Sequence, residues 1–247
     1  MTMDHVARTK RFVDPAHRFL VAIIFAVSLP GVAASPGHAT KVPTTEAAFV
    51  EAPVPPSLKT VESSAEDIVD FALSKDRGGV SATAASLKAA ANGPAAAALT
   101  RSGVPSAELA QLKARANRVA QLAGSGSFIA IALAANAVSE LMADLYGRFQ
   151  DRVPARILRL DYLDREAQLR SLARQKEKVA VAMRQLGPTW VRLRPKVIAA
   201  GGARQAAAYD RHVAAMKRLV RGAGKNVQAE AVHGLELVDQ LEQVFTR

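Results

Sequence analysis

One pattern recurs four times along this chain and restricts its fold more than any other feature. A predicted helix ends near a leucine, a short turn of glycine or polar residues follows, and a second helix begins near a valine or phenylalanine. The leucines are Leu73, Leu122, Leu172 and Leu219, and the residues near the start of the second helices are Val80, Phe128, Val179 and Val227. A period of about 50 residues predicts helical hairpins that bury their apolar faces against one another.

The composition agrees with helices rather than sheets. Apolar residues make up 49% of the chain and aromatic residues only 5%, and alanine, the strongest helix former, supplies much of the apolar share. We therefore expect an all-α fold: an antiparallel helical bundle built from about four helical hairpins. The chain has no cysteine, which excludes disulfides, cysteine-ligated metals and a cysteine nucleophile.

The N-terminal residues have the order of a secretory signal. Basic side chains precede a short apolar run over residues 19–29, and a proline–glycine pair and small residues follow. This order predicts a signal peptide over residues 1–34, cleaved after Ala34 or, as an alternative, after Ala39. An uncleaved membrane anchor is the other interpretation of the same residues. In either case we expect the bulk of the chain in a bacterial periplasm.

Residues 35–60 are rich in proline and predict a flexible spacer, which leaves residues 61–247 as the helical bundle domain. Ser63 to Glu66 resembles a capping box at the start of a helix, and Gly78-Gly79 is expected to end that helix. Gly187-Pro188 is expected to kink or break a later helix. The uncharged stretch 119–139 contains a Gly-Ser-Gly-Ser turn, so we interpret it as a helix end and a buried helix start rather than a membrane span.

Positive charge is concentrated in one part of the chain. Residues 148–225 contain nineteen Lys or Arg and six Asp or Glu, a net charge of +13, whereas residues 226–247 have a net charge of −3. This distribution indicates either a binding surface for an anionic partner (lipid headgroups, an acidic protein or a polyanion) or a solvated helix face. The candidate binding residues are Arg156, Arg159, Arg192, Arg194 and the neighbouring Trp190. A nucleic acid partner is not expected, because the chain has an export signal and no stacking or groove-reading motif.

A second candidate site contains the Glu-x-x-His spacing of Glu230 and His233, with Glu236 three residues further on. In metal-binding helical bundles such pairs point inward. Here the apolar stripe through Ala231 and Gly234 places His233 and Glu236 toward solvent, and no second Glu-x-x-His is present. We keep these residues as a candidate metal site.

Asp161 and Asp164 lie in the densest acidic cluster and share a helix face. Paired carboxylates can perform acid–base chemistry when their environments separate their pKa values. The alternative is charge pairing with the surrounding arginines on an exposed face. Because the chain lacks a phosphate-binding loop, a nucleophile elbow and a His-Glu-x-x-His motif, we do not expect an enzyme or a cofactor.

Two stretches carry a resemblance to known proteins. The segment from Trp190-Val-Arg-Leu-Arg-Pro195 to Leu235-Glu-Leu-Val-Asp-Gln-Leu-Glu-Gln-Val-Phe245, together with Arg159-Leu-Asp-Tyr-Leu163, resembles a group of secreted bacterial helical proteins with no assigned activity. His233-x-x-Glu236 is similar to part of the Gly-x-His-x-x-Glu signature of imelysin-type periplasmic proteins, with Ala231 in place of the glycine. The first resemblance implies a helical bundle, and the second implies a link to metal uptake.

These observations predict a non-enzymatic periplasmic helical-bundle protein that binds a protein partner or an anionic ligand through a basic face. Such a partner could be an envelope protein, and no stable transmembrane span is expected once the signal is removed. The alternative is a periplasmic metal-binding protein of the imelysin type.

Overall fold

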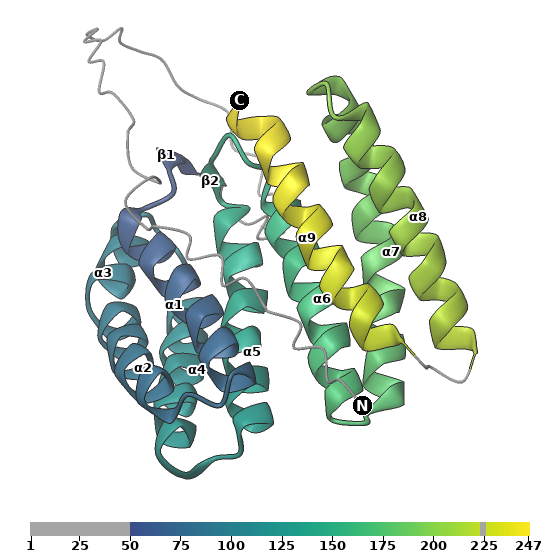
Figure 1. Cartoon of the computed structure of the whole chain (residues 1–247). Helices are drawn as coiled ribbons and strands as arrows, with labels where there is room; N and C mark the ends of the chain where they lie inside the picture. The colour runs from purple at the N-terminus through teal and green to yellow at the C-terminus, as the bar shows by residue number, and fades with distance from the viewer. Residues whose placement is uncertain (1–49, 223–225) are drawn as a thin grey trace, which may run out of the picture. The chain divides into compact units, whose positions relative to one another are not determined.

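The computed structural model describes residues 50–222 and 226–247, and they form an all-α fold (Figure 1). This confirms the predicted fold class. The predicted signal peptide, and the part of the predicted spacer before residue 50, lie outside the described residues. The helices are α1 (Pro56–Leu73), α2 (Arg77–Asn92), α3 (Pro94–Arg101), α4 (Ser106–Ser125), α5 (Phe128–Tyr146), α6 (Ala155–Leu172), α7 (Lys176–Ala199), α8 (Ala203–Arg221) and α9 (Val227–Thr246).

The repeating pattern of the sequence corresponds to pairs of consecutive helices. The pairs α1–α2, α4–α5, α6–α7 and α8–α9 each pack against one another, as the hairpin prediction requires. Leu73 and Leu172 end α1 and α6, and Phe128 and Val227 begin α5 and α9. The short helix α3 was not predicted. It follows α2 directly, and Pro94 stands at its start, where a missing N–H costs nothing.

The bundle begins earlier than the sequence indicated. The prediction that Ser63 to Glu66 starts a helix is wrong, because these residues lie inside α1, which begins at Pro56. Before α1, strand β1 (Val50–Pro53) pairs in parallel with strand β2 (Phe149–Gln150). Val54 is buried, so the end of the predicted spacer belongs to the folded domain.

Gly78 and Gly79 have the opposite role to the one predicted, because they lie at the start of α2 instead of ending α1. The Asp76 side chain caps α2 by accepting a hydrogen bond from the Gly79 N–H at 2.9 Å. A Cβ at Gly79 would lie 2.5 Å from the ring of Phe71. The glycine is therefore needed for the close approach of α1 and α2.

The interior divides into two apolar clusters. The first core lies among α1 to α5, and the second core lies among α6 to α9. Helices α5 and α6 pack together where the two cores meet; α5 also packs on α1, and α6 also packs on α7 and α9. Polar contacts cross the same junction: Asn136 Nδ2 donates to Glu166 Oε2 at 3.0 Å, and Arg165 Nη2 lies 3.5 Å from Glu66 Oε1.

Helix α5 is the one helix in the described part of the chain whose length and composition would allow it to cross a membrane. It packs against α1, α4 and α6, and eleven of its residues are buried in the bundle. This agrees with the interpretation of the stretch that follows the Gly-Ser-Gly-Ser turn as a buried helix start.

Candidate functional site

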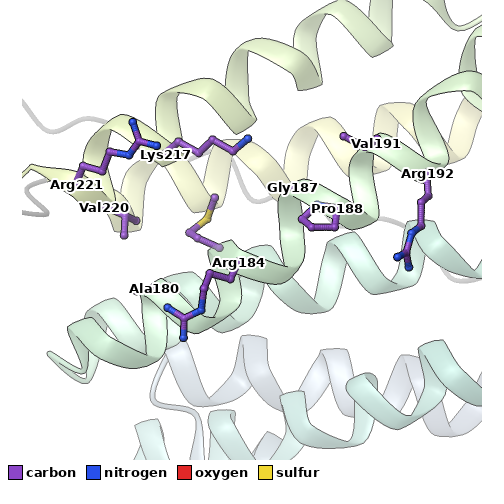
Figure 2. A pocket seen from close by; sticks show the side chains of 10 residues that line it. Ala180, Arg184, Gly187, Pro188, Val191, Arg192, Lys217, Val220 and Arg221 are labelled. Atoms are coloured by element: carbon purple, nitrogen blue, oxygen red, sulfur yellow. The ribbon is translucent and has the colours of Figure 1, made fainter.

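An open groove runs between α7 and α8 in the second half of the chain (Figure 2). Its volume is about 640 Å³, within the range of ligand sites. Ten residues line this α7–α8 groove: the apolar or small residues Ala180, Met183, Gly187, Pro188, Val191 and Val220, and the basic residues Arg184, Arg192, Lys217 and Arg221. None of the ten is acidic, so the lining combines an apolar surface with positive charge.

The Gly187-Pro188 pair lies in the wall of this groove. Of the predicted kink or break, the break is wrong, because α7 continues through Pro188 and also through Pro195, and the kink stays a prediction. A proline inside a helix has no N–H for the carbonyl one turn earlier, so each proline leaves one backbone acceptor without its usual donor. Val191, between the two prolines, is 68% exposed, the most exposed large apolar side chain in the described residues. The outer face of α7 therefore presents an uncovered apolar surface beside the basic residues.

The four basic residues of the groove differ in their ion pairing from Arg165, which lies at the junction of the cores. Within the described ranges, Arg184, Arg192, Lys217 and Arg221 form no ion pair. By contrast, Arg165 is paired with Asp161 at 2.6 Å. The groove thus holds positive charge that no acidic side chain of the described chain neutralises.

The structure places two of the predicted binding residues away from the groove lining. Trp190 is a buried core residue whose Nε1 donates to Asp210 Oδ1 at 2.7 Å and whose ring lies 4.7 Å from that of Tyr209. Arg194 Nη2 lies 2.9 Å from Asp210 Oδ2, and this hydrogen-bonded pair lowers the pKa of Asp210. Arg192 is the one predicted binding residue that lines the groove.

The remaining predicted binding residues lie on α6. Arg159 pairs with Asp144 of α5, and its guanidinium carbon lies 5.6 Å from the centre of the Tyr162 ring. Arg156 is exposed and does not line the groove. The five predicted residues therefore do not form one surface.

The candidate metal ligands are not brought together. His233 and Glu236 are exposed, as predicted, and His233 Nδ1 lies 3.4 Å from Glu236 Oε2. Glu230 instead lies 2.9 Å from Nδ1 of His212 on α8. The described residues contain no group of three His, Asp or Glu side chains arranged to hold a metal ion.

A buried chain of hydrogen bonds involving His212 was missed by the sequence analysis. His212 Nε2 lies 2.9 Å from Asp164 Oδ1, and the hydroxyl of Tyr209 donates to Asp164 Oδ2 at 2.6 Å. Burial would lower the pKa of His212, but the carboxylates of Asp164 and Glu230 outweigh burial and raise it. Helix α9 packs against both α6 and α8, which carry Asp164 and His212 (Figure 1).

The prediction that Asp161 and Asp164 share an exposed face is wrong. Asp164 is 0% exposed. Burial, which outweighs the Arg165 charge, raises the pKa of Asp161 to about 6. The expected pairing with an arginine is present, because Arg165 contacts Asp161. Both carboxylates contact other side chains of the bundle, His212 for Asp164 and Arg165 for Asp161, and neither lines the α7–α8 groove.

No protein family, curated protein or solved structure matches this chain. The resemblances to secreted bacterial helical proteins and to the imelysin type stay predictions.

Proposed function

We propose that this protein is a non-enzymatic periplasmic helical-bundle protein that binds an anionic partner through the α7–α8 groove. One observation carries the proposal: four basic residues without an ion-pair partner in the described chain surround an apolar lining that contains no acid. In such a groove, electrostatic attraction brings an anionic partner close, and apolar contact stabilises the bound state at the same place.

Binding is favoured over catalysis because Lys217 is the one groove residue whose type can act as a base or a nucleophile, and no second group that could assist it lines the groove. The lining contains no carboxylate, histidine, serine or threonine. The best acid–base candidates, Asp164 and His212, are buried and hydrogen-bonded to each other. The metal-binding alternative is less favoured, because Glu230 contacts His212 and does not lie with His233. The periplasmic location rests on the order of residues at the N-terminus.

The test compares two double charge reversals with equal change in net charge. Arg184→Glu/Arg221→Glu alters the groove, whereas Arg156→Glu/Arg204→Glu alters exposed arginines that do not line it. The probes are polyglutamate, anionic phospholipid vesicles and polyphosphate, each titrated at low and physiological salt. The wild type should bind at least one probe, and the groove variant should bind it about tenfold more weakly while the control stays close to the wild type.

Circular dichroism and thermal unfolding confirm that both variants are folded. If the wild type binds none of the three probes, or if the two variants lose affinity equally, the groove is not the binding site and the proposal fails.

A further inference from the structure

The exposed apolar side chains of α7 form a continuous stripe along its outer face. Val181, Pro188, Val191, Pro195 and Ile198 are all exposed and are separated by seven, three, four and three residues. This spacing places them on one side of the helix. Side chains on neighbouring packed helices form ridges and grooves into which the ridge of a further helix fits. The stripe and the α7–α8 groove therefore have the geometry of a binding surface for one more helix.

The molecule already contains a helix of the type that would fit. Helix α9 carries four acidic residues and no lysine or arginine. It packs on α6 and α8, with Ala231, Gly234 and Val238 buried and Glu230 beside His212 of α8. Helices α6 and α8 therefore already hold one acidic amphipathic helix, while α7 and α8 keep, along the groove, four cations that no acid of the described chain pairs.

We propose that the α7–α8 groove binds an acidic amphipathic helix supplied by a partner protein. This inference rests on the proposed function and specifies the partner. A row of apolar side chains on the partner, spaced three and four residues apart, contacts Met183, Pro188 and Val191. Acidic side chains on either side of that row pair with Arg184 and Arg192 of α7 and with Lys217 and Arg221 of α8. Met183 is buried in the second core, so only the part of its side chain that lines the groove takes part in this contact.

A membrane surface fits the groove less well. Helices that lie in the membrane interface insert large apolar side chains such as Trp, Phe and Leu several ångströms into the lipid. None of these residue types lines the α7–α8 groove, where the apolar side chains are Ala, Met, Pro and Val. The site is also a hollow and not a protrusion (Figure 2). These features favour a helix that inserts into the groove over a bilayer into which the protein inserts.

The experiment uses the full folded chain and a designed, fluorescently labelled peptide of about 20 residues. The peptide has leucine at helical i, i+3, i+4 and i+7 positions and glutamate and alanine elsewhere. A second peptide has the same composition with the leucine periodicity scrambled, and a third carries lysine in place of glutamate. Anisotropy gives the affinity, and circular dichroism follows the helicity of the peptide on binding.

The acidic amphipathic peptide should bind at least about tenfold more tightly than the scrambled and lysine peptides, and should gain helicity. Val191→Asp, in the groove, should weaken binding about tenfold, because it places a negative charge in the apolar contact. Val232→Asp is the matched control: Val232 is an exposed valine of α9 that does not line the groove. Its affinity should equal that of the wild type.

The possible failures are distinguishable. Equal binding of the acidic and scrambled peptides overturns the helix inference while leaving a basic anion-binding groove in place. Tighter binding of anionic vesicles than of the peptide, lost in Val191→Asp, overturns it in favour of a membrane surface. Absence of binding to every anionic probe overturns both this inference and the proposed function.

Discussion

The two cores are built from the same kind of helical hairpin but differ in what they enclose. In the first core, among α1 to α5, the buried polar residues are neutral: Ser64, Asn136 and Ser139. In the second core, among α6 to α9, they include the titratable pair Asp164 and His212. The groove and its four basic residues also belong to the second half. The comparison teaches that a repeated hairpin sets the architecture, while the fully buried acid–histidine pair and the basic groove are found in the second half.

The sharpest test of this difference removes a buried polar side chain from each core. Asp164→Ala takes away the acceptor of both Tyr209 and His212 in a fully buried place. We expect the free energy of unfolding to fall by about 3–5 kcal/mol, because a buried imidazole and a buried hydroxyl lose their partner. Ser139→Ala should change it by less than about 1 kcal/mol, since Ser139 Oγ has no hydrogen-bond partner within the described chain. Urea unfolding measures both, and equal effects would show that the cores do not differ in this way.

A pH profile of stability tests a group at the junction of the cores. Burial, followed by the charge of Glu66, raises the pKa of Glu62 from 4.5 to about 8; Glu242 and Asp161 add to the effect, and the Tyr146 hydroxyl, which donates to Glu62, opposes it. A carboxyl whose folded pKa lies above its unfolded value destabilises the fold as pH rises between the two values. A histidine with a raised pKa, such as His212, likewise loses its contribution as pH rises through its folded pKa.

The free energy of unfolding should therefore fall from about pH 5 to about pH 9, by an amount on the order of a few kcal/mol. Glu62→Gln should remove most of the fall between about pH 5 and pH 8, leaving the parts due to His212 and to Asp161, whose pKa is also raised. Chemical unfolding at a series of pH values measures both profiles. A flat wild-type profile, or a variant as steep as the wild type, contradicts the assignment of this dependence to Glu62.

The smallest effect concerns two helical glycines. A Cβ at Gly234 of α9 would lie 2.6 Å from Asp164 Cγ and 2.6 Å from His212 Nε2, so Gly234→Ala should cost about 1–3 kcal/mol by overpacking. A Cβ at Gly124 of α4 would meet no atom of the described chain within 4 Å, so Gly124→Ala should be neutral or stabilise by up to about 1 kcal/mol. Thermal unfolding compares the two. Similar effects would mean that the second core tolerates extra volume as freely as an open surface.

The periodic features of the fold were predictable from the sequence. The stripe through Ala231, Gly234 and Val238 is buried as expected, and Leu73 and Phe128 mark helix ends in the predicted register. Such features depend on residues within a few turns of one another, which a single sequence displays. Pro56 and Gly78-Gly79 were misassigned because the same residue types both begin and end helices, and tertiary packing decides between these roles.

The burial of the hydrogen-bonded residues Asp164 and His212 was predictable from the sequence, but their hydrogen-bond partners were not. Asp164 stands four residues after Leu160 and three before Ala167, and His212 stands three after Tyr209, so both fall on apolar stripes. The place of Asp164 on an apolar stripe indicated that it is buried, and the prediction of an exposed face overlooked this. The pairing of Asp164 with His212, and of His212 with Glu230, depends on how three helices pack, which local spacing does not specify. The same holds for the groove, which joins residues of α7 to residues of α8 about 30 positions later.

The short parallel pairing of β1 with β2 also has a mechanical consequence. It fastens the chain just before α1 to the connection between α5 and α6, which joins the two cores. A pull applied along the chain from its N-terminal side reaches this connection before it reaches the first turn of α1. Tension on the chain ahead of β1 would therefore load the junction of the two halves first, while the groove-forming helices α7 and α8 lie outside that direct path.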